Sequence, residues 1–419
     1  MQTILHDNNV KSDIFFSIVW QGFKILFLAT WVILSAKCLG AEYYGLFNGI
    51  TGIAFCLSSL SSFGFTYYLL QEGAREPSTL QTLWEKALFV CITGSLIAII
   101  SLFCIDIFFN LHIDNFTLLL LAFSELLFIP FTAISASALA SQGLVVLGAA
   151  IPALAAFVRL AFTTIFWLSS LEKSIENYAY FHSVASFMTG IACVLLTHQK
   201  ANLIFKITPP KIHDIKKTFL FFVSHSLTNT LGGMDKYLAM KLASPELAGI
   251  YTLGLRVTSA LIQPIDAAIN SLLPRMFKNS LRTAPQLKSI FYYFLAGYIA
   301  LASLILLIAG DLVFVYMGPD YAQITNSLIL FVLLIPATSA RLLASSILLT
   351  SNQTAKKLVS ELIGIICLII AGIHLIPGNG LDGIVAALLA AEVVQIISSA
   401  AFIISSHSPA NQQLISKEK

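Results

Sequence analysis

Long apolar runs decide what this chain can fold into. Twelve of them follow one another along the 419 residues, with few charged residues inside them. A helix needs about 20 mostly apolar residues to cross the hydrocarbon core of a bilayer, and the helix satisfies its own backbone hydrogen bonds there. We therefore predict twelve transmembrane helices, at residues 14–36, 45–70, 86–109, 117–140, 147–169, 177–198, 218–242, 247–272, 289–309, 324–350, 358–376 and 382–404.

The composition agrees with an all-α integral membrane protein. The chain is 57% hydrophobic and 11% charged, whereas about 25% of the residues of a soluble domain are charged. The six cysteines and eight histidines show no metal-ligand spacing, and the sequence contains no phosphate-binding loop. We therefore expect no metal, no cofactor, no catalytic residues and no nucleic-acid partner.

Lysine and arginine residues predict how the helices are oriented. If the N-terminus lies in the cytoplasm, only Lys37, Lys173 and Lys241 fall in outside segments, whereas most of the 24 lysines and arginines fall in cytoplasmic ones. Positive residues favour the cytoplasmic side of a membrane. The asymmetry therefore predicts that both termini are cytoplasmic.

A short turn occurs twice in the sequence, about half a chain apart. The pattern Lys-x4-Glu-x2-Gly at residues 37–45 recurs at residues 241–249, and long apolar runs flank both copies. Internal repeats of this kind are typical of membrane transporters. The copies follow the first and the seventh predicted spans, so each marks the beginning of a six-helix half.

The longest loop separates these two halves. Residues 199–217 contain five lysines and two adjacent prolines, and they join an N-terminal half (1–198) to a C-terminal half (218–404), which a cytoplasmic tail (405–419) follows. Because six is an even number, both halves enter the membrane in the same direction. The repeat is therefore expected to be parallel, with a pseudo-twofold axis along the membrane normal.

Nine ionisable residues lie deep within the predicted spans. Each costs roughly 2.5–3.5 kcal/mol at a helix centre on insertion scales, so each requires a partner, a water-filled cavity or a function. Five are cations, which we predict to line a cavity and bind an anionic group of the substrate: Lys24, Arg159, Lys236, Arg256 and Arg341. Four are acids, which are candidates for ion coupling: Asp235, Glu125, Asp266 and Glu392.

Lys24 lies in the middle of the first span, which has no acidic residue after Asp13. We favour a position in the central cavity, facing phosphate groups. The alternative is that Lys24 extends toward the interface or pairs with a carboxylate of a neighbouring helix.

The seventh span is the most polar. His225, Asn229 and Lys236 share one face at helical spacing, so we expect this helix to line water or protein rather than lipid. The alternative is that Asp235 and Lys236 are neutralised by neighbouring groups near the outer third of the membrane. In the eighth span, Arg256 offers a planar guanidinium suited to phosphate, and a structural pair with Asp235 or Asp266 is an equal alternative.

Two further pairs of opposite charge lie in the spans. Glu125 and Arg159 fall on the fourth and fifth spans, and we favour a buried ion pair between them over a proton or ion site. Glu392 and Arg341 each allow either a structural contact or titration during transport. The residues alone do not distinguish these roles.

Several motifs carry a resemblance to a known family. They are residues 40–47 (Gly-Ala-Glu-Tyr-Tyr-Gly-Leu-Phe), the stretch 234–256, Leu273-Pro274-Arg275, and residues 317–321 (Met-Gly-Pro-Asp-Tyr). With twelve spans in two halves, the chain resembles the polysaccharide (O-antigen) flippases of the multidrug/oligosaccharidyl-lipid/polysaccharide exporter superfamily. The resemblance implies that it translocates undecaprenyl-pyrophosphate-linked oligosaccharide across the bacterial inner membrane by alternating access, with ion coupling. It also implies membrane lipid, a polysaccharide polymerase and chain-length machinery as partners.

Two other functions remain open. A multidrug or cation antiporter of the same superfamily is similar in its spans, but such proteins tend to place a carboxylate in the N-terminal half, often on the first helix, where this chain has Lys24. A membrane-embedded polysaccharide polymerase would need a large outside loop for its chemistry. The longest outside segment, residues 310–323, is too short to form a catalytic domain.

Overall fold

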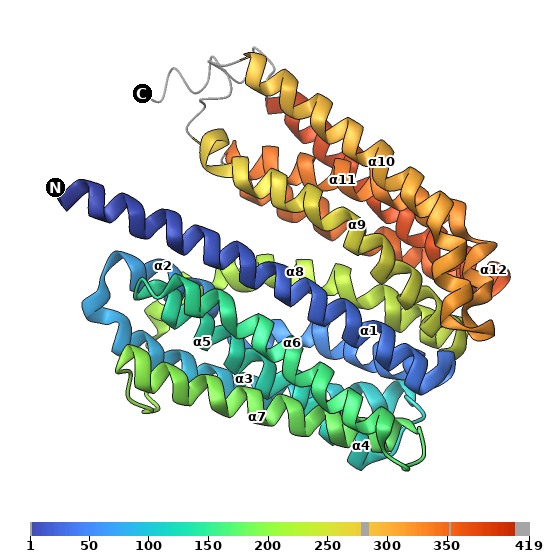
Figure 1. Cartoon of the computed structure of the whole chain (residues 1–419), viewed down its shortest axis with the longest axis horizontal. Coiled ribbons are helices and arrows are strands. Elements are labelled where there is room, and N and C mark those ends of the chain that lie inside the picture. Colours follow the sequence, from blue (N-terminus) through green and yellow to red (C-terminus); the bar gives the residue numbers. More distant parts are fainter. Residues whose placement is uncertain (1, 278–284, 352, 407–419) are drawn as a thin grey trace. The chain divides into compact units, whose positions relative to one another are not determined.

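The computed structural model describes residues 2–277, 285–351 and 353–406, and all regular secondary structure in these residues is helical (Figure 1). Residues 407–419 of the predicted tail lie outside this range. Three short turns interrupt the succession of α-helices: η1 (Pro77–Thr79), the π-helical η2 (Ser124–Phe128) and η3 (Pro319–Thr325). The α-helices are α1 (Gln2–Ser62), α2 (Phe65–Arg75), α3 (Leu80–Phe109), α4 (Asn115–Phe123), α5 (Ile129–Ser141), α6 (Val145–Leu168), α7 (Ile175–Ala201), α8 (Ile212–Leu242), α9 (Pro245–Phe277), α10 (Pro285–Met317), α11 (Leu328–Thr350) and α12 (Thr354–Ser406).

Eight helical stretches among the described residues are long and apolar enough to cross a membrane, which makes this a multi-pass membrane protein. Large apolar side chains on their surfaces are exposed, and the exposed fraction reaches 79% for Ile107 and 82% for Phe108 of α3. Such side chains suit a lipid environment rather than water.

Two of the eight stretches are much longer than one span. They cover 48 residues of α1 and 52 residues of α12, whereas about 20 residues cross the hydrocarbon core. Each helix has one break in its backbone, at Gly40 (φ 70°) and at Gly380 (φ 52°). Because positive φ is readily adopted only by glycine, these two positions allow each helix to change direction.

Both copies of the repeated turn coincide with an interruption of the helices. Gly40 lies within the first copy, and the second copy contains the gap between α8 and α9. There the Ser244 hydroxyl accepts a hydrogen bond from the Leu247 N–H (3.1 Å), which caps the first turn of α9. The sequence correctly predicted a turn at each place.

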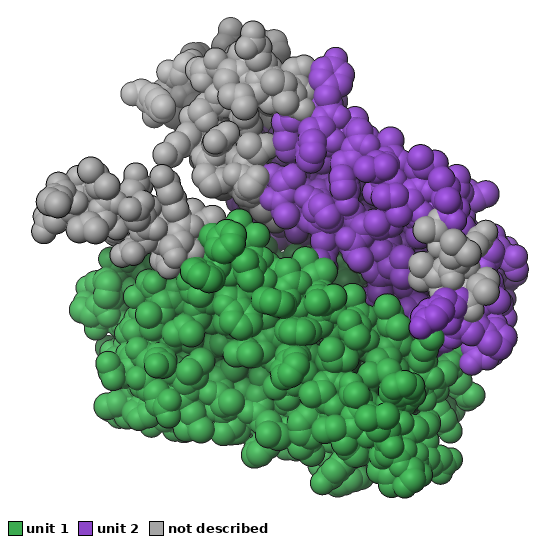
Figure 2. Space-filling view, in the orientation of Figure 1, with its two compact units in different colours: residues 1–234 green, residues 235–419 purple. Residues whose placement is uncertain are grey.

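The chain forms two compact units, unit 1 (residues 1–234) and unit 2 (residues 235–419), which Figure 2 colours separately. The boundary lies inside α8, so most of this helix packs with α1–α7. The sequence places the boundary between the two repeat halves at 199–217, and that division stays a prediction about the repeat.

Unit 1 includes the segment that was predicted to be a linker. Leu203 is buried in the same apolar cluster as Trp84 and Phe65. The side chain of Gln81 on α3 both donates to the Ile204 carbonyl (3.1 Å) and accepts from the Ile204 N–H (2.9 Å). Residues 202–211, which we call the strap, therefore lie fixed on α3.

Two charged side chains of α3 complete the attachment of the strap. Glu85 accepts a hydrogen bond from the Thr208 hydroxyl at 2.6 Å, and Lys86 forms an ion pair with Asp214 at 2.8 Å. Asp214 also accepts from the Lys211 N–H at 2.9 Å. The strap is thus held at both of its ends and in its middle.

Small residues allow the helices of unit 1 to pack closely. A Cβ atom on Gly94 of α3 would lie 2.2 Å from the Leu60 carbonyl oxygen of α1. Only glycine fits at such a distance, and close backbone approach at small residues is a usual means of packing helices in membranes.

Candidate functional site

A cavity of about 230 Å³ lies in unit 1. Its wall combines apolar and aromatic groups with hydroxyl, amide, imidazole and carboxylate groups. The lining residues are Phe55, Ser58 and Ser62 of α1, Thr66 and Tyr67 of α2, Glu125 of η2, Ile129, Pro130 and Ala133 of α5, and His225 and Asn229 of α8. An apolar cavity with a few converging polar groups is the usual form of a small-molecule site.

The polar face of α8 contributes to this cavity, as the sequence predicted. Asn229 donates to the Ser58 hydroxyl at 2.9 Å and lies 3.4 Å from Nδ1 of His225. One turn further along α8, Gly233 packs against α1, where a Cβ atom would lie 2.3 Å from the Gly52 carbonyl oxygen. The helix runs without a break through Gly232 and Gly233.

A π-helical turn places Glu125 at the wall of the cavity. Pro130 has no N–H to donate to the Leu126 carbonyl, and its ring crowds that carbonyl. The freed carbonyl accepts a hydrogen bond from the buried Ser95 hydroxyl of α3 instead. The Ile129 N–H bonds to the Ser124 carbonyl, five residues earlier. Short π-helical segments of this kind occur frequently at functional sites.

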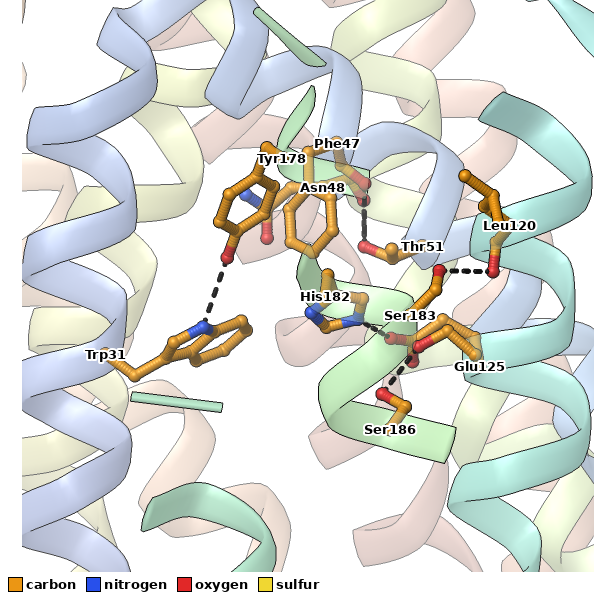
Figure 3. Close-up of polar contacts among 11 residues, drawn as sticks. Trp31, Phe47, Asn48, Thr51, Leu120, Glu125, Tyr178, His182, Ser183 and Ser186 are labelled. Atoms are coloured by element: carbon orange, nitrogen blue, oxygen red, sulfur yellow. Dashed lines mark hydrogen bonds and ion pairs between the residues drawn. The ribbon is translucent and has the colours of Figure 1, made fainter. Parts of the chain in front are cut away.

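Glu125 is paired with a buried histidine of α7. The Nε2 atom of His182 lies 2.8 Å from Oε1 of Glu125, and the exposed fraction is 1% for the histidine side chain and 16% for the glutamate. An ionised carboxylate only accepts hydrogen bonds, so the imidazole N–H donates. Figure 3 shows the imidazole pointing at the carboxylate from the neighbouring helix.

Aromatic rings enclose the other sides of His182. The centroids of Trp31, Tyr178 and Phe47 lie 6.1, 6.0 and 5.1 Å from that of the imidazole, and the first two rings are stacked on it (Figure 3). The Trp31 indole N–H donates to the Tyr178 hydroxyl at 3.1 Å. His182 is therefore closed off by rings, whereas Glu125 reaches the cavity.

Hydrogen bonds from serine hydroxyls link the helical segments beside this pair. Ser124 donates to the Ser186 hydroxyl at 2.7 Å, and Ser183 donates to the Leu120 carbonyl at 2.8 Å. Both contacts join α7 to the helix that carries Glu125. Both contacts follow His182 along α7 and precede Glu125 along its own segment, so they hold the two segments together beside the pair.

Glu125 and Arg159 do not have the neighbours that the sequence suggested. We expected a buried ion pair between them, but the structure places His182 against Glu125, and the Arg159 guanidinium lies over the Trp31 ring, 5.8 Å from its centroid. Sequence reasoning missed His182 because a lone histidine in an apolar run has no partner at helical spacing. The positive charge of Arg159 still acts on His182 through space.

In unit 2, two of the acids that were candidates for ion coupling, Asp235 and Glu392, are paired. Asp235 is 3% exposed. It accepts a hydrogen bond from the Tyr251 hydroxyl of α9 at 2.7 Å and lies 3.3 Å from Nζ of Lys236. Asp235 and Lys236 are thus neutralised locally, which was one of the two alternatives.

A second buried pair joins α11 to α12. Nε of Arg341 lies 2.5 Å from Oε2 of Glu392, and the side chains are 18% and 5% exposed. Arg341 is therefore in contact with Glu392, which supports a structural contact for these two residues.

The remaining predicted residues are less enclosed. Lys24 on α1 and Arg256 on α9 are half-buried, and Asp266 is exposed. Within the described chain, the buried Nε of Arg256 has no hydrogen-bond acceptor, and no ion pair links Arg256 to Asp235 or Asp266. The structural alternative for Arg256 therefore finds no support.

The chain is thus a multi-pass membrane protein with charged pairs and a polar cavity among its helices. Solved structures share this fold over most of their length. A lipid II flippase, MurJ, aligns with a TM-score of 0.76 at 14% identity, covering 93% of this chain and 87% of its own. An inward-facing multidrug resistance transporter of the MATE family aligns with a TM-score of 0.65 at 15% identity, covering 92% and 97%.

A MOP-superfamily transporter from Pyrococcus furiosus aligns with a TM-score of 0.61 at 14% identity, covering 94% of both chains. No match was found among curated proteins. A family model described as polysaccharide biosynthesis protein matches residues 10–280. The chain belongs to this polysaccharide biosynthesis protein family, and it has the fold of the MOP-superfamily transporters.

Proposed function

We propose that this chain is a flippase that moves undecaprenyl-pyrophosphate-linked oligosaccharide units, such as O-antigen repeats, across the bacterial inner membrane. The observation that carries the proposal is the family match over residues 10–280. The similarity of fold to a lipid II flippase supports it. A polysaccharide polymerase and chain-length machinery are the partners that such a unit would meet next.

The proposed architecture is twelve spans in two parallel halves, with both termini cytoplasmic. The breaks at Gly40 and Gly380 support it, because each divides a helix that is long enough for two spans. The polar helices α8 and α9 would supply two further spans lined by protein. Alternating access would then come from movement of one half against the other.

Cations would bind the pyrophosphate as the headgroup crosses. Arg256 is the best supported of them, because its Nε is buried without an acceptor in the described chain, and a guanidinium matches phosphate oxygens in geometry. Lys24 is another candidate. Lys236 and Arg341 are weaker ones, since they already contact Asp235 and Glu392, and Arg159, which lies over the Trp31 ring, would act through the aromatic cluster of unit 1.

Transport is proposed to be coupled to an ion. The acids available for this role are Glu125, Asp235, Glu392 and Asp266. Three of them are buried or partly buried against a named partner, and intramembrane carboxylates are the usual carriers of coupling protons and ions.

Deletion of the gene followed by analysis of lipid-linked sugars tests the proposal. Lipid-linked units trapped on the cytoplasmic leaflet, and released to the outer leaflet when the chain is restored, are the expected result. Delivery of single units to the outer leaflet without their polymerisation would indicate a polymerase instead.

Charge-removing variants test the roles of the cations. K24M, K236M and R256M should stop assembly of surface polysaccharide at normal protein levels, whereas K24R, K236R and R256K keep the charge and serve as matched controls. Normal polysaccharide in all three methionine variants would exclude these residues from substrate binding.

The fold similarity to a multidrug transporter favours a second candidate, a drug or cation antiporter. Drug-susceptibility profiles of the deletion strain distinguish the two. A flippase leaves these profiles unchanged, whereas an antiporter lowers the tolerated concentration of several unrelated cationic drugs.

A further inference from the structure

The Glu125–His182 pair differs from the other buried pairs in the described chain because its base is an imidazole, which can change charge near neutral pH. A carboxylate paired with an arginine faces a permanent cation. Imidazole, in contrast, gains or loses a proton between about pH 5 and 8. With Nε2 and Oε1 2.8 Å apart, one proton more or less changes the charge of the pair directly.

The surroundings of the pair make it suitable for one proton. The carboxylate, a neutral imidazole and the guanidinium of Arg159 together have no net charge, and one added proton makes the group positive. In the described chain, no group of three or more His, Cys, Asp or Glu side chains is placed to hold a metal ion. Hard metal cations require several oxygen ligands, so this geometry favours H⁺ over a metal ion.

The pair also has a route for the proton, and its carboxylate lies on an irregular helical turn. Glu125 lines the cavity, whereas His182 is 1% exposed behind Trp31, Tyr178 and Phe47. A proton from the cavity therefore reaches the carboxylate first and the imidazole second. Glu125 lies on the π-helical η2, a strained geometry that often marks functional sites.

Other charged and titratable groups around the pair are few. Arg159 of α6 acts on His182, Tyr178 of α7 stacks on it, and Tyr67 of α2 and His225 of α8 line the same cavity. From α3, α4 and α5 the nearest contributions are hydroxyl, backbone carbonyl and apolar groups. His225 is therefore the residue whose titration must be separated from that of His182.

We propose that Glu125 and His182 form a proton-binding site that couples the proton gradient to transport, with Glu125 exchanging the proton with the cavity and His182 storing it. This inference rests on the proposed function, since it names the ion of an ion-coupled flippase. In the loaded state His182 is an imidazolium, with protons on both Nδ1 and Nε2, and its Nε2–H donates to Oε1 of Glu125. On release the Nε2–H bond breaks as an O–H bond forms at Oε1, and this proton then passes to the cavity, which leaves a carboxylate and a neutral imidazole protonated on Nδ1. Loading runs through the same atoms in reverse.

Tryptophan fluorescence of the purified full-length chain tests proton binding without substrate. Trp31 stacks on His182, and an imidazolium beside an indole quenches its emission. We expect a drop in emission on acidification between about pH 8 and 5 that is absent from W31F and H182Q and unchanged in H225Q. In E125Q the pH at the midpoint of this drop in emission should fall by about one to three units. The carboxylate charge that favours the protonated imidazole at this distance is absent from that variant.

Transport in cells tests the coupling. At equal protein levels, E125Q and H182Q should lower the delivery of lipid-linked sugar to the outer leaflet at least tenfold, and the delivery that remains should no longer respond to a protonophore. H374Q, which changes an exposed histidine of α12, should transport normally and stay protonophore-sensitive.

Each result has one meaning. A fluorescence step that persists in H182Q, or that never occurs, overturns the proton site. A step that behaves as expected, with unchanged protonophore-sensitive transport in both E125Q and H182Q, overturns its coupling role. If the unaltered chain moves no lipid-linked sugar while the step is present, the proposed function fails and the proton site stands.

Discussion

The two compact units treat their buried carboxylates differently. In unit 1, Glu125 faces a cavity and is held by His182, a weak base in a cage of aromatic rings. In unit 2, Glu392 is held by Arg341, and Asp235 by Tyr251 and Lys236. An arginine remains charged at every physiological pH, whereas a histidine does not. The pairs of unit 2 therefore suit a structural role, whereas the Glu125–His182 pair of unit 1 suits a change of charge during a transport cycle.

The largest effect is expected from breaking the permanent pair of unit 2. R341M leaves the Glu392 carboxylate buried without its cation, and removing one partner of a buried ion pair costs about 3–5 kcal/mol of stability. Thermal unfolding in detergent micelles measures this loss. The double variant R341M/E392L should recover most of it, and equal losses in the single and double variants would contradict a structural role for the pair.

A smaller loss is expected where a hydroxyl supports a carboxylate. Y251F removes the 2.7 Å hydrogen bond to Asp235 and keeps the ring. Hydrogen bonds to charged groups contribute about 1.5–3 kcal/mol, so the unfolding free energy should fall by about that amount. Y293F, which alters an exposed tyrosine of α10, is the matched control, and an equal change in both variants would refute the role of Tyr251.

Removal of His182 should cost less than removal of Arg341. H182F keeps a ring among the aromatic groups but removes the hydrogen bond between Nε2 and Oε1 of Glu125, at a cost of about 1–3 kcal/mol. E125Q should be milder still, because an amide oxygen also accepts a hydrogen bond. A loss in H182F as large as that in R341M would remove the distinction between the two units.

The smallest effect is expected at the strap, which is part of neither the Glu125–His182 pair of unit 1 nor the buried pairs of unit 2. Burial acts to raise the pKa of Asp214, but the hydrogen bonds from Lys86 and the Lys211 N–H prevail and hold that pKa below its ordinary value of 3.8. The ionised carboxylate therefore stabilises the strap above about pH 3.8, and this contribution is lost as the pH falls through the lowered pKa.

Hydrogen exchange at residues 202–211 measures the attachment of the strap. K86M should speed the exchange several-fold at neutral pH, as expected for a pair worth about 1 kcal/mol. The unaltered chain should show comparable exchange only in acid. Exchange that does not depend on Lys86 would mean that Gln81 and Glu85 hold the strap alone.

Much of the fold was accessible from the sequence, because each span carries its own signal. Apolar length identified the helices, glycine marked the turn at Gly40, and polar spacing identified the face of α8 that lines the cavity. The π-helical turn was also accessible in principle. A proline five residues after a glutamate, within one apolar run, indicates a freed backbone carbonyl beside a buried charge.

The partners of the charges were not accessible in the same way. Arg341 and Glu392 are 51 residues apart, and Glu125 and His182 are 57 apart, so only the packing of helices decides which charges meet. Proximity in topology favoured Arg159 for Glu125, yet its guanidinium lies over Trp31. A histidine also gives no hydropathy signal strong enough to identify it as a partner.

The strap bears on where this chain can be divided. A connector that was only a free tether could be cut without loss to the helices on either side. Here the connector contributes Leu203 to the apolar core of unit 1 and binds α3 through Gln81 and Glu85. A fragment that ends at residue 198 would lack part of its own core. An N-terminal fragment must therefore extend through Asp214, and a protein cut within the strap should give an unstable N-terminal piece.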